Sequence, residues 1–66
     1  MRIVCNGKDE ELAQGTTIAQ LIADKGINQA NVVVEHNYTL VKSDRWSEVV
    51  LQENDRLEIL RLVGGG

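Results

Sequence analysis

The sequence has very little of what a metal site, a disulfide or a membrane span requires. Among its 66 residues there is one cysteine, Cys5, and one histidine, His36. A single cysteine cannot form a disulfide within the chain, and two soft ligands are too few for a structural zinc site. No apolar run approaches the length that crosses a bilayer. The sequence also contains no phosphate-binding loop and no nucleophile beside a base, so we do not expect an enzyme.

Basic residues are also scarce. Seven Lys and Arg stand against ten Asp and Glu, for a net charge of −3, and the basic residues are scattered along the chain. Because nucleic-acid binding needs basic patches, we expect no nucleic-acid partner. The N-terminus has a strand pattern rather than that of a signal peptide, and a free cysteine without a secretion signal indicates the cytoplasm.

The first half of the chain predicts a hairpin followed by a helix. Residues 1–6 alternate as a half-buried strand with Cys5 on the inward face, where we expect an inert core thiol. Asn6-Gly7 begins a turn, and residues 10–13 form a short return strand. Thr17 predicts a helix N-cap, with Gln20 completing a capping box, and Gly26 predicts the helix end. The apolar face of this helix holds Ile18, Leu21 and Ile22.

The second half predicts three more strands. Residues 27–30 form a loop, and residues 31–36 form a strand that can pair parallel to the first strand. A turn at 37–38, a brief strand at 39–41 and a helical turn capped by Ser43 follow. After a polar turn at 52–55, the last strand, residues 56–63, is expected to pair with the first in the centre of the sheet. His36 lies at a strand end with no partner marked by spacing, so we expect it to be structural, and Trp46 to pack in the core.

This order of elements predicts an α+β fold, a mixed sheet with one main helix packed across one face. That is the β-grasp arrangement. It would comprise residues 1–63, followed by a flexible glycine tail at residues 64–66. Leu60 and Leu62 have the opposite strand parity to Leu57 and Ile59. We expect Leu60 and Leu62 to form an exposed partner site beside the tail; the alternative is that the chain's own loops cover them.

The glycine tail is the most informative segment of the chain. Glycine has no Cβ, so Gly64, Gly65 and Gly66 cannot pack a core. Extended, they reach about 10 Å beyond the folded body and carry the terminal carboxylate of Gly66. Such a tail can thread a narrow channel and present its carboxylate to an enzyme. The alternative is a frayed chain end, which is common in proteins.

Taken together, these features resemble the ubiquitin-like sulfur carriers of bacteria, most closely the thiamine-biosynthesis carriers of the ThiS type. The resemblance covers the whole chain, although no single motif is specific. The sequence departs from the family pattern in three places: Tyr38 stands where a glycine is common, Lys42 stands where a proline is common, and the tail has three glycines rather than the minimal two. The segments that carry the resemblance are residues 1–4 with Asn6-Gly7, 17–22, Val34-Glu35-His36-Asn37, Leu40-Val41, Arg45-Trp46, Asn54-Asp55 and the terminal Gly65-Gly66.

The resemblance implies a carrier that supplies no catalytic group and binds no cofactor. A ThiF-type adenylating enzyme would use ATP and magnesium to adenylate the carboxylate of Gly66. Cysteine-derived sulfur would then convert it to a thiocarboxylate, and the carrier would deliver the sulfur to a thiazole synthase. Gly64 and Gly65 would let the tail enter the partners' channels. The residues expected to contact the partners are Leu60, Arg61, Leu62 and Val63.

Two other classes remain open from the sequence. One is a sister carrier that serves molybdopterin, cysteine or a siderophore pathway. The other is a protein modifier or binding module with the same fold and no sulfur chemistry. We expect a monomer, although an exposed patch could support a weak dimer.

Overall fold

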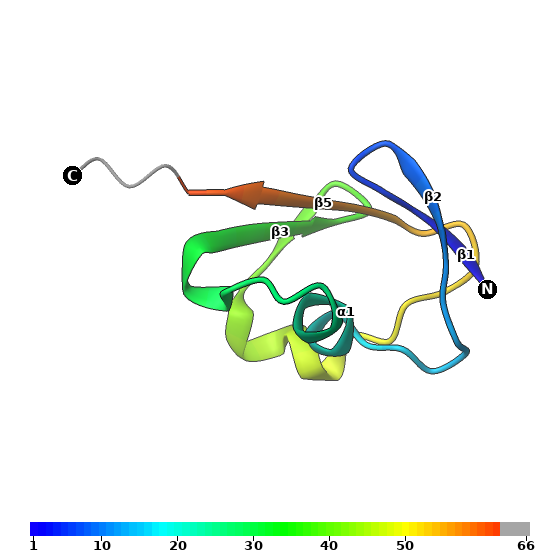
Figure 1. Cartoon of the computed structure of the whole chain (residues 1–66), viewed down its shortest axis with the longest axis horizontal. Coiled ribbons are helices and arrows are strands. Elements are labelled where there is room, and N and C mark those ends of the chain that lie inside the picture. The colour runs from blue at the N-terminus through cyan, green and yellow to red at the C-terminus, as the bar shows by residue number, and fades with distance from the viewer. Residues whose placement is uncertain (63–66) are drawn as a thin grey trace.

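A five-stranded mixed sheet carries one α-helix on one face (Figure 1). The structure, a computed structural model, describes residues 1–62, so Val63 and the three terminal glycines lie outside the described residues. The strand order is β2-β1-β5-β3-β4, which confirms the β-grasp prediction. The elements are β1 (Arg2–Cys5), β2 (Lys8–Glu11), α1 (Ile18–Asp24), β3 (Val32–His36), β4 (Thr39–Val41) and β5 (Arg56–Arg61), with two 3-10 helices, η1 (Gln29–Asn31) and η2 (Ser43–Glu48).

The β1–β2 hairpin closes on two residues. Asn6 and Gly7 have φ of 51° and 81°, the left-handed conformations that a tight hairpin turn requires. Cys5 therefore pairs directly with Lys8, and β2 begins two residues before the predicted return strand at 10–13. The predicted position of the return strand was wrong. The polar residues Lys8 and Asp9 suggested a longer turn, but the turn contains only Asn6 and Gly7.

The last strand occupies the centre of the sheet, as predicted. β5 runs parallel to β1, with Cys5 opposite Leu57, and antiparallel to β3, with Val34 opposite Ile59. The parallel pairing of β3 with β1 was wrong, because β5 lies between them. The central position suits β5 because Leu57 is fully buried beneath the helix.

The helix begins and ends where the sequence predicted. The Thr17 hydroxyl accepts a hydrogen bond from the Gln20 backbone N–H at 3.1 Å, and the Gln20 side chain accepts one from the Thr17 N–H at 3.1 Å. This is the predicted capping box. Gly26 follows the helix with φ +68°, a conformation that favours glycine. The predicted apolar face, Ile18, Leu21 and Ile22, is buried against the sheet.

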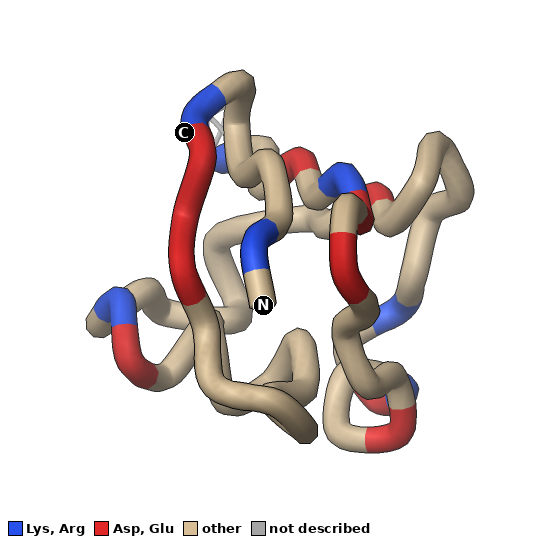
Figure 2. The backbone as a smooth tube through the Cα atoms, turned by 90° about the vertical axis from the view of Figure 1, so that its right-hand side faces the viewer, with Lys and Arg blue, Asp and Glu red and all other residues tan. Residues whose placement is uncertain are grey.

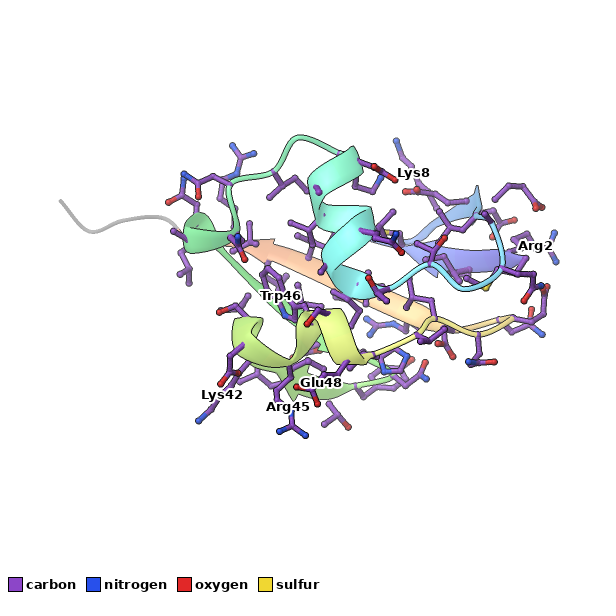
Figure 3. The ribbon with its side chains drawn as sticks, turned by 90° about the horizontal axis from the view of Figure 1, so that it is seen from below. Arg2, Lys8, Lys42, Arg45, Trp46 and Glu48 are labelled. Atoms are coloured by element: carbon purple, nitrogen blue, oxygen red, sulfur yellow. The ribbon has the colours of Figure 1, made fainter. Side chains whose placement is uncertain are left out.

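Trp46 fills the space between η2 and the sheet, as predicted. It is buried, and its indole N–H donates to the Val41 carbonyl at 2.8 Å. It points inward from η2, whereas Arg45 and Glu48 point outward (Figure 3). The predicted cap at Ser43 was wrong: Lys42 occupies the N-cap position and makes no side-chain capping bond. η2 is a 3-10 helix held by its buried tryptophan, so it does not depend on a cap.

The loop predicted at residues 27–30 contains a short helix. Asn28 caps η1, because its side-chain oxygen accepts from the Ala30 N–H at 3.0 Å. Basic positions are scattered over the chain, and an acidic run, Asp9 to Glu11, lies within β2 (Figure 2). Within residues 1–62, no helix is both long and apolar enough to cross a membrane.

Candidate functional site

The end of β5 presents apolar side chains on the face of the sheet that α1 does not cover. Leu60 is 45% exposed and Leu62 is 53% exposed, which confirms the predicted exposure. Leu60 lies opposite Val33 on β3, and Leu40 on β4 is diagonal to Val33. We call Leu60, Val33 and Leu40 the open-face strip. Exposed apolar residues that adjoin one another in this way are typical of a protein-binding surface.

Arg61 lies on the other face of β5. It pairs with Val32, which is buried on the helix side of the sheet, so the alternation of the strand turns Arg61 away from Leu60. Arg61 and Leu62 line a hollow of about 670 Å³ beside Lys25. The predicted contact residues Leu60 and Arg61 thus lie on opposite faces, while Val63, Gly64, Gly65 and Gly66 lie outside the described residues.

A backbone hydrogen bond extends the β3–β5 pairing one residue past the end of β5. The Leu62 N–H donates to the Asn31 carbonyl at 2.7 Å, which fixes residue 62 against η1. Among residues 1–62, the guanidinium of Arg61 forms no ion pair, in contrast to Arg2, Arg45 and Arg56. Leu62 is therefore anchored through its backbone, and the charge of Arg61 is not neutralised by any side chain among the described residues.

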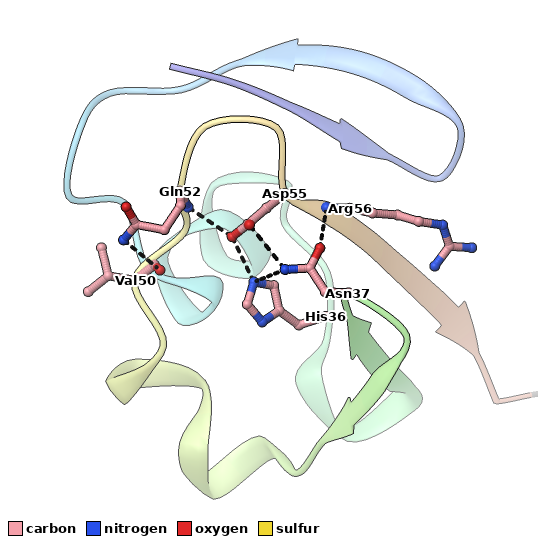
Figure 4. Close-up of polar contacts among 6 residues, drawn as sticks. All are labelled: His36, Asn37, Val50, Gln52, Asp55 and Arg56. Atoms are coloured by element: carbon pink, nitrogen blue, oxygen red, sulfur yellow. Dashed lines mark hydrogen bonds and ion pairs between the residues drawn. The ribbon is translucent and has the colours of Figure 1, made fainter.

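The start of β5 carries a dense polar cluster (Figure 4). Asp55 is buried, and its carboxylate accepts from the Gln52 N–H at 2.8 Å and the Asn37 side-chain amide at 3.1 Å. His36 Nε2 lies 2.7 Å from Asp55 Oδ2. Asn37 also accepts from the Arg56 N–H at 2.9 Å. The cluster therefore fixes the β3–β4 turn, the polar turn before β5 and the first residue of β5 in one arrangement.

The charge of Asp55 is stabilised by these contacts. Burial alone would raise the pKa of this carboxyl group, but the hydrogen bonds from His36, the Gln52 backbone and Asn37 favour the charged form more strongly. The pKa of Asp55 therefore lies below its ordinary value. Spacing does not reveal Asp55 as the partner of His36, because the two residues lie 19 positions apart in the chain. The signal that could have revealed it is the β3–β5 register, which places His36 opposite Leu57, two residues after Asp55.

Cys5 is the buried core residue that the sequence predicted. Burial is the main reason that the pKa of its thiol is raised, and the neighbouring Glu10 raises it further. Lys25 lies close enough to oppose this shift, but it is paired with Glu10 at 2.7 Å. The thiol is therefore protonated at neutral pH and a poor nucleophile. Within residues 1–62, no group of three or more His, Cys, Asp or Glu could hold a metal ion.

The model of the ThiS family matches residues 2–66. The chain belongs to the ThiS family. It is 39% identical over 62 residues to the sulfur carrier protein ThiS of Bacillus subtilis strain 168, covering 92% of this chain and 94% of that protein. The crystal structure of the thiamine biosynthesis protein ThiS from Geobacter metallireducens superposes with a TM-score of 0.85 at 26% identity, over the full length of both chains.

A further relative is longer. The chain is 30% identical over all 66 residues to a thiazole synthase of Paramagnetospirillum magneticum, and it spans only 20% of that protein. The family match, the Bacillus relative and the Geobacter structure agree on the ThiS family and on its fold.

Proposed function

We propose that the chain carries sulfur as a thiocarboxylate on Gly66 and donates it for the thiazole ring of thiamine. A carboxylate is a poor electrophile, so it must first be activated. The carboxylate of Gly66 attacks the α-phosphate of ATP and displaces pyrophosphate, giving an acyl-adenylate. Hydrosulfide, released from a cysteine-derived persulfide by a thiol that is oxidised to a disulfide, then attacks the acyl carbon; AMP leaves, and Gly66 ends in a thiocarboxylate. The observation that carries this proposal is the ThiS-family match over a sequence that ends in Gly64, Gly65 and Gly66.

The chemistry of activation belongs to partner proteins in the cytoplasm. A ThiF-type adenylating enzyme binds ATP and magnesium, and a desulfurase supplies sulfur from cysteine. A thiazole synthase receives the sulfur. Support for the last partner comes from the Paramagnetospirillum relative, a protein named thiazole synthase of which one fifth resembles this whole chain. A segment that resembles this chain is thus part of a longer protein that is named a thiazole synthase.

The two faces of β5 have different tasks in this proposal. Leu60 and its neighbour Val33 give the partner an apolar surface on the open face. Arg61 and Leu62 are contacted from the side of the 670 Å³ hollow. A partner that holds both faces fixes the direction in which the chain leaves β5. Val63 continues this contact, and Gly64 and Gly65 carry no side chain that could block a narrow channel.

The proposal is tested by growth complementation. The gene for this chain is expressed in a bacterial strain that lacks its thiazole sulfur carrier, and in a second strain that lacks its molybdopterin sulfur carrier. We expect growth without added thiamine in the first strain and no molybdoenzyme activity in the second. Rescue of the second strain alone would contradict the thiamine assignment and support the sister pathway.

The matched control is the same chain without Gly66, which keeps every described residue. It is expected to accumulate normally and to fail in the first strain. The truncated chain still ends in a carboxylate, that of Gly65, so its rescue would contradict the requirement for the carboxylate at position 66.

A further inference from the structure

β5 loses one of its two neighbours before it ends (Figure 1). The last pair between β1 and β5 joins Cys5 and Leu57. The next residue, Asn6, has a φ of 51° and turns the chain back into β2. Its side-chain oxygen accepts from the Ile59 N–H at 2.7 Å, and its side-chain nitrogen donates to the Ile59 carbonyl at 3.3 Å. Asn6 thus stands in for one more strand residue and ends the row of the sheet that β1 occupies.

Arg61 is the first residue of β5 that has no neighbour on this side. The Leu62 N–H donates to the Asn31 carbonyl, and hydrogen-bonded and non-hydrogen-bonded pairs alternate in an antiparallel ladder. The N–H and C=O of Arg61 therefore point away from β3, toward the row that β1 has left. Among residues 1–62, neither group has a hydrogen-bond partner. Residue 61 thus presents one donor and one acceptor at an open strand edge.

A groove adjoins this edge on the face of the sheet that carries α1. Three hollows of about 220, 270 and 670 Å³ lie there, and Ile27 lines all three. The hollow of 270 Å³ is lined by both Asn6 and Arg61, which places it at the gap that Asn6 leaves in the row of β1. Ile27 and Ile59 are partly buried and give the groove an apolar floor. We call it the basic groove, and the lining residues used below are Asn6, Lys8, Lys25, Ile27, Ile59 and Arg61.

The basic groove has the opposite charge to the chain as a whole. Three of the seven Lys and Arg line it, Lys8, Lys25 and Arg61, against one acidic residue, Glu10. Glu10 is already paired with Lys25 at 2.7 Å. Lys8 and Arg61 form no ion pair with any residue in the range 1–62. The groove therefore attracts anionic groups although the net charge of the chain is −3.

We propose that the basic groove binds an extended, acidic segment of a partner protein, which adds to the sheet as a strand in the row that β1 leaves at Asn6. The backbone of this segment bonds the N–H and C=O of Arg61. Its apolar side chains pack on Ile27 and Ile59, and its carboxylates pair with Lys8 and Arg61. A nucleotide phosphate would match the cations but would leave the strand edge unpaired, so a peptide fits the observations better.

This inference deepens the proposed function. It rests on that proposal for the partner, which contacts Arg61 from this side, and it adds the chemistry by which the partner is recognised. An added strand would hold β5 at the point where β1 no longer does. The test below uses peptides and measures binding without any sulfur transfer. A failure of binding and a failure of growth complementation are therefore separate results.

The probe is a blocked synthetic peptide of about six residues, the usual length of a strand, in which glutamate and valine alternate. It is titrated into the full chain while backbone amide resonances are followed by NMR. We expect the largest shifts at Arg61 and Ile27 and slower hydrogen exchange at the Arg61 amide. The dissociation constant should be on the order of 1 mM, because one short strand buries less surface than a standard interface.

Two matched peptides separate the two contributions to binding. A peptide with lysine in place of glutamate keeps the strand and reverses the charge. The acidic peptide with methylated backbone nitrogens keeps the charge and cannot donate hydrogen bonds to β5. We expect each to bind about tenfold more weakly or worse, because each retains only one of the two attractions.

Two substitutions at Arg61 test the chain itself. Arg61→Glu should abolish binding of the acidic peptide, and Arg61→Lys should retain it within about threefold, because the charge is kept. Arg45→Glu is the matched control, since it makes the same charge change at an exposed residue of η2 outside the groove. It should bind as the original chain does. Circular dichroism should be the same for all three variants.

Several results would overturn the proposal. Absence of any shift at Arg61 with about 10 mM acidic peptide would do so, since that is tenfold above the expected dissociation constant. Equal binding of the lysine peptide or of the methylated peptide would also contradict it. Shifts confined to the open-face strip would place the peptide on the other face of the sheet. Equal losses in Arg61→Glu and Arg45→Glu would show a general charge effect in place of a groove.

Discussion

The two ends of β5 are built in opposite ways. At its start, Asp55 and Arg56 are held by side-chain bonds from His36 and Asn37. At its far end, the Leu62 N–H makes one backbone bond, and the side chains of Leu60 and Leu62 are exposed. The first end pairs the Asp55 carboxylate and the Arg56 backbone N–H within the chain, although the buried Nη1 of Arg56 has no hydrogen-bond partner among the described residues. The second end leaves apolar side chains exposed. One central strand thus begins in a hydrogen-bonded cluster and ends, within the described residues, at exposed apolar side chains.

The largest effect is expected at the open end. Two variants should abolish activation by the adenylating partner. Deletion of Gly66 shortens the tail, so its terminal carboxylate no longer reaches the reacting position. Gly65→Trp adds a bulky side chain that blocks a narrow channel. Release of pyrophosphate measures activation. The thermal midpoint should not change, because neither residue belongs to the described fold. Normal activation in either variant would contradict the tail's role.

The next effect is expected at the closed end. Asp55→Ala removes three hydrogen bonds to a buried carboxylate and should lower the free energy of unfolding by about 3 kcal/mol. Chemical denaturation measures it. A loss below about 0.5 kcal/mol would show that the cluster does not hold β5, since changes of that size are typical of ordinary surface positions.

The pH dependence of this loss has a definite sign. The pKa of Asp55 is lowered in the fold, so its contribution is fully present above its unfolded value and is lost as the pH falls through the folded value. The stability gap between the original chain and Asp55→Asn should therefore be constant near neutrality and shrink below about pH 4. A gap that widens toward acid would contradict the assignment.

A smaller effect is expected on the open-face strip. Leu60→Asp should raise the KM of the activating enzyme for the carrier about tenfold, because it places a charge in an apolar contact. Stability should change little, since Leu60 is 45% exposed. Val50→Asp is the matched control, similarly exposed and away from β5, and should leave KM unchanged. Equal effects from both variants would argue for a general charge effect.

The smallest effect is expected at Cys5. Cys5→Ser should cost about 1 to 2 kcal/mol of stability, because a hydroxyl replaces a buried thiol. Thiocarboxylate formation should be unchanged at a temperature where the variant is folded. Loss of transfer in the folded variant would show that this thiol takes part in sulfur transfer despite its raised pKa.

Much of the fold could be predicted because the local signals agree with the tertiary structure. The helix bounds were predictable from the capping box at Thr17 and Gln20 and from the glycine after α1. The alternation of apolar residues in the first and last strands indicated that these two strands pair in the centre of the sheet. The errors lie where a turn or a short helix depends on distant contacts. The β2 boundary follows from the two-residue turn, and η2 depends on the burial of Trp46 rather than on Ser43.

The candidate site was predictable only in part. The parity of the last strand indicated that Leu60 and Leu62 are exposed, and the glycines marked the chain end. The partner of His36 was not predictable, because the spacing of residues in the sequence does not show that the fold places Asp55 beside the end of β3. The placement of Leu60 and Arg61 on opposite faces followed from strand alternation, but the hollow beside Arg61 is formed by the loop after α1.

The most direct test of the central claim is the intact mass of the chain after incubation with cell extract, ATP and cysteine, beside a copy that lacks Gly66. We predict a gain equal to the exchange of one oxygen for sulfur, seen only in the chain with Gly66. No gain, or conjugates to other proteins in its place, would contradict the account of a sulfur carrier.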